Sequence, residues 1–205
     1  MVTPGPTTPF RLCLLLSRDL CRLEPLEVLD RALDGGVDLV QLREKELAPA
    51  DFLAWALEAL PLCRRRGIPL VINDQLDVAL ASEADGIHVG QDDLPPREIR
   101  PLLGPERLIG LSTHSLEQLE TAADEGFADY VGFGPAFPTS TKGYESGLGA
   151  DAVLSASVFA RLLVLAIGGI TPENRPLLGQ RTGVAVSSAI CAAERPEEVA
   201  AALLA

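Results

Sequence analysis

The sequence is short of basic residues. It holds 17 lysines and arginines against 29 aspartates and glutamates, which gives a formal net charge of −12. Proteins that bind nucleic acids concentrate lysine and arginine on one face, so this balance argues against broad contact with a phosphate backbone. A small anionic molecule needs only a few local cations, and we expect a partner of that kind instead of a nucleic acid.

Cysteines and long apolar segments are also scarce. The 4 cysteines form no CxxC pair and no regular framework, so we expect reduced thiols and neither disulfides nor a zinc site. No apolar run approaches the ~20 residues of a membrane helix, and the run 12–16 is too short for the core of a signal peptide. We therefore expect a soluble, cytoplasmic protein with no membrane partner, and the sequence leaves a homo-oligomer open.

The length of 205 residues, 47% of them hydrophobic, allows one sizeable core and fits one domain better than two. Residues 1–9 are rich in proline and threonine and are expected to form a loose tail, which leaves 10–205 as the catalytic domain. In that range short apolar runs alternate with longer amphipathic stretches, a pattern typical of a parallel sheet covered by helices. Eight such pairs in about 200 residues favour an α/β fold of the (β/α)8-barrel type, with a doubly wound open sheet as the alternative.

The expected strands are 11–16, 38–42, 69–72, 86–89, 108–111, 129–133, 162–167 and 183–187. The expected helices are 26–34, 48–66, 75–81, 96–103, 116–125, 150–159, 172–178 and 196–204. Gly67 and Gly126 follow helical patterns directly and are expected to end them, because glycine adopts the left-handed cap conformation easily. Pro61 lacks an N–H and is expected to kink or split the helix 48–66.

Polar side chains follow the expected strands, at the end where (β/α)8 barrels place their chemistry. Gln41, Arg43 and Lys45 alternate along one such segment and can point the same way. Arginine as a planar fork and lysine as a point charge suit a polyphosphate. Taken alone, the motif also fits a solvated surface pair, and its position after a strand favours anion binding.

Two carboxylates, Asp74 and Asp93, follow strands that would be neighbours in a barrel. They could hold Mg2+, which uses few protein carboxylates and completes its shell with substrate phosphate and water. A general acid–base pair is the alternative, and the adjacent anion-binding segment favours the metal. Asp92 competes with Asp93 but is expected to face solvent.

The loop after strand 129–133 contains two prolines, which are followed by Thr139, Thr141 and Lys142. Two hydroxyls and an ammonium group so close together would suit the other face of the pyrophosphate that Arg43 and Lys45 are expected to bind. The alternative interpretation is an ordinary polar turn, because threonine and serine are common in loops.

The last two expected strands are followed by Gly169 and by Ser187 and Ser188. Barrel enzymes commonly bind a phosphate at this place, where backbone N–H groups and a helix N-terminus approach its oxygens. A tight turn is the alternative. His88 and His114 fit no metal spacing or catalytic triad, so we interpret both as structural hydrogen-bonding groups.

Together these segments resemble thiamine phosphate synthase. The match runs in order over most of the chain, and an ordered set is far more specific than any one motif. The motifs are QLREK at 41–45, ND at 73–74, GIHVGQDDL at 86–94, STH at 112–114, DYVGFGPAFPTSTK at 129–142, AIGGITPEN at 166–174 and AVSSAI at 185–190.

The resemblance implies a (β/α)8 barrel that joins 4-amino-5-hydroxymethyl-2-methylpyrimidine pyrophosphate to hydroxyethylthiazole phosphate, with Mg2+ as cofactor. The implied reaction is dissociative: pyrophosphate leaves, and the thiazole nitrogen captures a pyrimidine-stabilised cation. The implied ligands of the pyrimidine substrate are Gln41, Arg43, Lys45 and Asn73, those of Mg2+ are Asp74 and Asp93, and those of the thiazole phosphate are Thr139, Thr141, Gly169, Ser187 and Ser188. Ser112, Lys142 and Arg43 are the implied catalytic groups at the pyrophosphate and the reacting centre.

The chain departs from the family pattern at three places. Gln75 stands where the family usually has arginine, Ser187 replaces a branched apolar residue, and the first strand lacks the usual aromatic and Thr-Asp pattern. One rival is the thiazole tautomerase branch of the fold, which carries a histidine where this chain has Pro135. A second rival, favoured by the first two departures, is a non-catalytic barrel that binds a metabolite.

Overall fold

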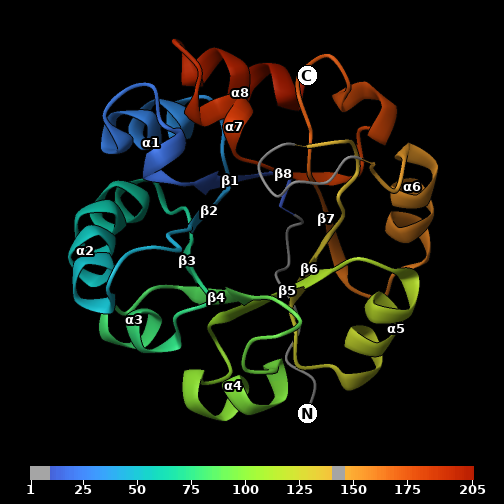
Figure 1. Ribbon diagram of the computed structural model, residues 1–205, viewed down its shortest axis with the longest axis horizontal. Helices are drawn as coiled ribbons and strands as arrows, with labels where there is room; N and C mark the ends of the chain where they lie inside the picture. The colour runs from blue at the N-terminus through green and yellow to red at the C-terminus, as the bar shows by residue number, and fades with distance from the viewer. Residues whose placement is uncertain (1–9, 140–145) are drawn as a thin grey trace.

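The computed structural model describes residues 10–139 and 146–205. Its strands form one closed parallel barrel in sequence order, and β1 closes the ring by pairing with β8, Leu12 opposite Val184. The prediction of a (β/α)8 barrel is confirmed, and the doubly wound open sheet is wrong (Figure 1). The strands are β1 Leu12–Leu16, β2 Leu39–Leu42, β3 Leu70–Asn73, β4 Gly86–Val89, β5 Leu108–Thr113, β6 Tyr130–Phe133, β7 Leu163–Ile167 and β8 Gly183–Val186.

The helices surround this barrel (Figure 1). They are α1 Pro25–Asp34, α2 Pro49–Arg66, α3 Leu76–Ala81, α4 Pro96–Leu103, α5 Leu116–Glu125, α6 Ala150–Phe159, α7 Ser188–Cys191 and α8 Pro196–Leu204, with 3-10 turns η1 Arg18–Leu20 and η2 Arg175–Leu178. The prediction of a helix over 172–178 is wrong, because only the short η2 forms there. The helix α7 was not predicted, since four residues are too few to show a helical period. No helix in the described ranges combines the length and hydrophobicity needed to cross a bilayer.

The helix α2 runs without interruption through Pro61, so the predicted split does not occur. Pro61 lies on the exposed side, and the residue whose carbonyl it leaves unpaired, Leu57, is itself 52% exposed. Water can satisfy that carbonyl, while the opposite side of the helix packs on the barrel. The predicted helix ends at Gly67 and Gly126 are confirmed, with φ values of 67° and 69°.

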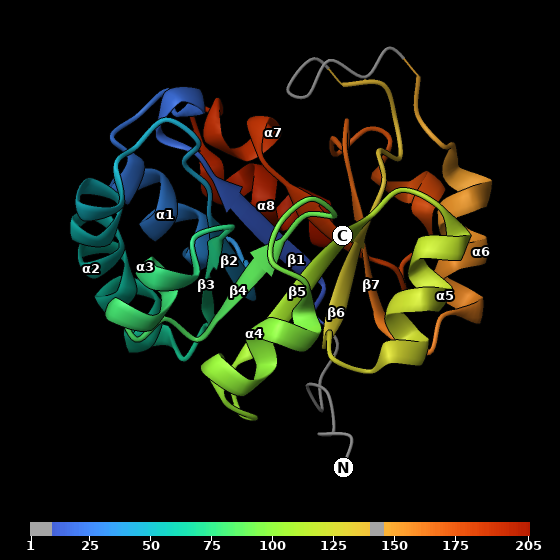
Figure 2. The ribbon, with the colours of Figure 1, turned by 60° about the horizontal axis from the view of Figure 1, so that its bottom comes forward.

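Two hydrophobic layers stabilise the barrel. The larger lies between the strands and the helices, and the smaller fills the interior of the barrel with side chains that include Leu15, Val71, Tyr130 and Leu165. Because these inward side chains fill the barrel, ligands can bind only at its ends. Figure 2 views the barrel from the side, with the arrowheads of β1 and β4 pointing toward the same end.

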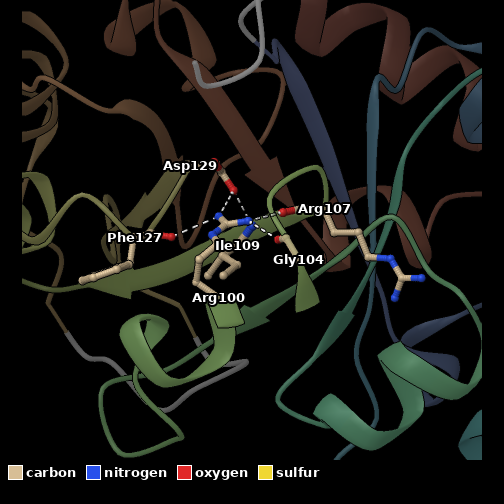
Figure 3. A network of polar contacts seen from close by, with 6 residues as sticks. All are labelled: Arg100, Gly104, Arg107, Ile109, Phe127 and Asp129. Carbon is tan, nitrogen blue, oxygen red and sulfur yellow. Dashed lines mark hydrogen bonds and ion pairs between the residues drawn. The ribbon is translucent and has the colours of Figure 1, made fainter. Parts of the chain in front are cut away.

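A polar network joins α4 to the amino ends of β5 and β6 (Figure 3). The Arg100 guanidinium forms an ion pair of 2.6 Å with Asp129 and donates to the carbonyl oxygens of Gly104, Arg107 and Phe127. Asp129 also accepts the backbone N–H of Ile109, at 2.7 Å. The two charged side chains are only 14% and 11% exposed, so this network links α4 to β5 and β6 away from the end where β5 carries Ser112.

Candidate active site

Two adjoining depressions lie at the carboxyl ends of the strands. The first, which we call the inner pocket, has an apolar floor that includes Leu15 and Ile167 and a rim that includes Gly169 and Ser188. The second, the polar cleft, is lined by charged and amide side chains that follow β2, β3 and β4. The residues shared by the two depressions are Arg43, Ser112 and His114.

Arg43, Glu44 and Lys45 all line the polar cleft, and Glu44 is held by a neighbouring arginine. Glu44 accepts the backbone N–H of Arg18 at 2.8 Å and forms an ion pair of 3.6 Å with its guanidinium. The Ser17 hydroxyl donates to the carbonyl of Arg43 at 2.9 Å, which fixes the backbone of the segment. The sequence offered no sign of this bracing, because Arg18 and Glu44 meet only through the pairing of β1 with β2.

Gln41 lies deeper in the barrel than Arg43 and Lys45, although the sequence pattern predicted that the three side chains point the same way. Its side chain is buried, forms a hydrogen bond with Tyr130 inside the barrel, and is not among the described residues that line either depression. The alternation that groups Gln41 with Arg43 and Lys45 holds only within an extended strand, and β2 ends at Leu42.

Asp74 and Asp93 meet in the polar cleft, as the sequence predicted for neighbouring strands. Desolvation, followed by the hydrogen bond and the negative charge of Asp93, raises the pKa of Asp74 to about 6, against the lowering effect of Arg43. Asp74 also has a φ of 62°, a left-handed conformation that is uncommon outside glycine and concentrates at functional sites. Asp92 is exposed, as expected, but Asp93 is exposed as well and both residues line the polar cleft.

Asp93 is itself oriented by the backbone, since its Oδ2 accepts the N–H of Gly90 at 2.7 Å. Asn73 lines the same cleft beside Asp74. Within the described residues, no His, Cys, Asp and Glu side chains form a group of three or more that could hold a metal ion. Among the described residues, Asp74 and Asp93 are a pair of neighbouring carboxylates in this cleft.

Ser112 lies at the junction of the two depressions, near the end of β5. His88 Nε2 is hydrogen-bonded to Ser112 Oγ at 2.9 Å, and His88 Nδ1 to the Tyr130 hydroxyl at 3.1 Å. His114 Nδ1 is hydrogen-bonded to the carbonyl of Gly134 at 2.7 Å. Both histidines thus bond within the protein, as expected, but the sequence reading missed that His88 orients Ser112.

Two glutamine side chains that sequence reasoning also missed hold this region of the polar cleft. Gln91 Nε2 donates to the carbonyl of Ser112 at 2.6 Å, and Gln118 Oε1 accepts the backbone N–H of His114 at 2.7 Å. Gln91 lies inside the GIHVGQDDL motif, so its place in that motif was a usable signal. Gln118 lies in α5, outside every motif, so nothing in the sequence indicated its role.

The rim of the inner pocket brings together the loops after β6, β7 and β8. Thr139, Gly169, Ser187 and Ser188 all line it. Gly169 has a φ of 64°, and a Cβ there would lie 2.4 Å from the carbonyl oxygen of Pro138, so the two loops are in direct backbone contact. The predicted ligands Thr141 and Lys142 lie outside the described residues.

The barrel and its two depressions define the class of protein: a (β/α)8-barrel enzyme acting on small molecules. The sequence profile of the thiamine monophosphate synthase family matches residues 12–190. The chain therefore belongs to the thiamine monophosphate synthase family, whose members are transferases of thiamine biosynthesis.

Individual relatives agree with this assignment. A thiamine-phosphate synthase of Chlorobium luteolum is 44% identical over 205 residues, covering 98% of this chain and 94% of the relative. A probable bifunctional thiamine biosynthetic enzyme of Oryza sativa is 43% identical over 85% of this chain, which spans only 32% of that longer protein. The solved structure of a thiamine phosphate pyrophosphorylase from Pyrococcus furiosus superimposes with a TM-score of 0.84 at 30% identity, over 95% of this chain and 93% of that one.

Proposed function

We propose that the chain forms thiamine phosphate by joining 4-amino-5-hydroxymethyl-2-methylpyrimidine pyrophosphate to hydroxyethylthiazole phosphate across the junction of its two depressions. The observation that carries the proposal is this junction, where an apolar pocket with a glycine and serine rim opens into a cleft of cations and carboxylates. The first suits the rings and the single phosphate, and the second suits the leaving pyrophosphate. Arg43 and Ser112 lie where the two meet.

In this proposal the pyrophosphate lies in the polar cleft. Arg43 and Lys45 supply fixed positive charge, and the Asn73 amide supplies a neutral donor. Lys142 would reach the same group from the loop after β6. Because these cations interact more strongly as negative charge collects on the departing oxygen, they favour the transition state over the bound substrate.

The carboxylate pair fits Mg2+ by its chemistry. Burial, and after it the neighbouring Asp93, raises the pKa of Asp74, and a divalent cation between the two carboxylates would stabilise both in their charged form. Asp74 and Asp93 would hold the ion, with the remaining positions left to pyrophosphate and water. When bound, Mg2+ supplies charge neutralisation for the pyrophosphate leaving group.

The inner pocket takes the two rings and the thiazole phosphate. We assign the phosphate to the Gly169 and Ser188 backbone, with Ser187, Thr139 and Thr141 as hydroxyl ligands. The apolar floor limits water around the reacting carbon, so the thiazole nitrogen meets less competition from hydrolysis.

Two further groups complete the assignment. Ser112, oriented by His88, lies next to the reacting centre. Gln41 would act on the pyrimidine only indirectly, because its side chain is bound to Tyr130 inside the barrel and lines neither depression.

The test is turnover by the purified full chain with both substrates and Mg2+, with thiamine phosphate and pyrophosphate measured together. We expect equal amounts of the two products, and none when either substrate is left out. Arg43→Ala should abolish most turnover, while Arg65→Ala, an equal loss of charge on the exposed side of α2, should not. A folded protein that binds the substrates without forming product would instead be a metabolite-binding barrel.

A further inference from the structure

Two thiols from opposite ends of the chain meet beside the inner pocket. Cys21 follows the 3-10 turn η1 after β1, and Cys191 ends the short helix α7 after β8. Figure 2 shows α7 close to the arrowhead of β1. The closing of the barrel, which pairs β1 with β8, is what brings the two segments together.

Three contacts fix this arrangement. The Cys21 thiol donates to the carbonyl of Ser17 at 3.3 Å, and the Cys191 thiol to the carbonyl of Leu15 at 3.6 Å. The backbone N–H of Arg22 donates to the carbonyl of Cys191 at 3.0 Å, so the two backbones run side by side. Since Leu15 and Ser17 are two residues apart at the end of β1, these contacts bring both thiols to the same place, and each thiol affects the pKa of the other.

The two members of the pair differ in access and in acidity. Cys21 is half-buried and open to a small oxidant, whereas Cys191 is buried behind it. The interaction between the two thiols raises the pKa of Cys21 and lowers the pKa of Cys191, so the pair holds one stabilised thiolate, the form that attacks a disulfide. By contrast, Cys13 and Cys63 are both buried, and burial raises the pKa of the Cys63 thiol to about 12.

Cys191 is connected to the rim of the inner pocket. The Ser187 side chain is hydrogen-bonded to the Cys191 thiol, and both Ser187 and Ser188 line the pocket. Since α7 spans only Ser188–Cys191, its far end lies within one turn of the rim. Because the backbone N–H of Cys191 also donates to the Ser187 carbonyl at 2.9 Å, a displacement of Cys191 would be transmitted directly to these two serines.

We propose that Cys21 and Cys191 form a redox-active thiol pair whose oxidation to a disulfide displaces the Ser187–Ser188 rim and weakens the binding of a phosphorylated ligand there. The oxidant is a low-molecular-weight disulfide. One thiol of the pair, as its thiolate, attacks the small disulfide and forms a mixed disulfide with release of one thiol. The other protein thiol then attacks the bonded protein sulfur with release of the second. Two protein thiols become one disulfide while the small disulfide becomes two thiols, so protons and electrons balance.

The first experiment tests the bond itself. The full chain is incubated with oxidised glutathione, alkylated, and mapped by mass spectrometry without reduction. We expect a peptide that joins Cys21 to Cys191, with Cys13 and Cys63 alkylated after unfolding. Cys63→Ser should still form the bond, whereas Cys21→Ser should not. A stable glutathione adduct on Cys21, or a pair that stays reduced, overturns the proposal.

The second experiment tests the effect on the rim, and it rests on the proposed function for its choice of ligand. Calorimetry compares the affinity of the reduced and oxidised chain for hydroxyethylthiazole phosphate. Oxidation should weaken binding roughly fivefold, the scale for losing one hydrogen bond, and a reductant should restore it. Cys21→Ser should bind like the reduced chain with or without oxidant. Equal affinity of the reduced and oxidised forms overturns the link to the pocket.

The two experiments separate this inference from the proposed function. If the reduced chain binds no thiazole phosphate, the proposed function loses its phosphate site and the link to the rim fails with it. The thiol pair itself is decided by the mapped disulfide, whatever the turnover of the enzyme.

Discussion

Gly169 lines the inner pocket at a position where one added carbon would meet the backbone of a neighbouring loop. Its φ of 64° is left-handed, and a Cβ would lie 2.4 Å from the Pro138 carbonyl oxygen and 2.9 Å from the Phe137 carbonyl oxygen. Both obstacles are backbone atoms, so no side-chain rotation relieves them. Gly169→Ala would therefore push back the loop that carries Thr139.

Gly126 provides a matched control. Its φ of 69° is nearly the same, yet nothing lies within 4 Å of a Cβ placed there. Gly126→Ala should cost only the left-handed strain, roughly 1–2 kcal/mol of unfolding free energy. Gly169→Ala should add an overpacking term of about 1–3 kcal/mol. The difference between the two variants then isolates the close approach of the loops.

Steady-state kinetics with each substrate varied in turn tests the effect on the site. A displacement of about 1 Å near a substrate can cost on the order of 100-fold in rate. We expect kcat/KM for hydroxyethylthiazole phosphate to fall roughly 10–100-fold in Gly169→Ala, and much less in Gly126→Ala. The KM for the pyrimidine substrate should change far less. Gly169→Ala with the kinetics and stability of Gly126→Ala would refute the reasoning, and equal losses for both substrates would indicate general misfolding.

Three more predictions concern charged groups. Asp74→Asn and Asp93→Asn should each weaken Mg2+ binding, measured by calorimetry with pyrophosphate present, and slow turnover; normal values in both variants would contradict the metal assignment. Lys142→Ala should cut single-turnover rates roughly 10–1000-fold with a nearly unchanged melting temperature, because exposed charges contribute only ~0–1 kcal/mol to folding; normal chemistry with a collapsed melting temperature would make the residue structural. Arg100→Met should lower the unfolding free energy by about 3 kcal/mol, since it strands a carboxylate that is 11% exposed. Arg97→Met, at a side chain 54% exposed, should change it by no more than about 0.5 kcal/mol in chemical denaturation.

The fold could be predicted because its elements are encoded locally. The runs at 86–89 and 183–186 are apolar and bounded by turn residues, and each expected strand coincides with an observed one to within two residues. The strand β5 continues to Thr113, beyond the expected end at 111, because hydrogen bonding to β6 extends it through polar residues. Periodicity cannot show this, since Ser112 and Thr113 look like a loop.

The depth of a side chain in the barrel could not be predicted in the same way. Gln41 pairs with Leu15 of β1 and Val71 of β3, and that register places it in the interior layer. Likewise, the contact of Cys21 with Cys191 follows from the closing of the barrel and has no local pattern in the sequence. Both depend on pairings between distant segments, which one sequence does not display.

In this chain, the charged residues at one end of the barrel stabilise the fold, and those at the other end are available for binding and chemistry. At the amino ends of the strands, the Arg100 guanidinium donates hydrogen bonds to three carbonyls and one carboxylate of the protein itself. At the carboxyl ends, Arg43 and Lys45 face a cleft, and their neighbour Glu44 is paired with Arg18. A cation whose partners are all internal can change only folding, whereas one facing the cleft can change binding and rate. Arg100→Met and Arg43→Ala should therefore move different observables, the first the unfolding free energy and the second the rate of pyrophosphate release.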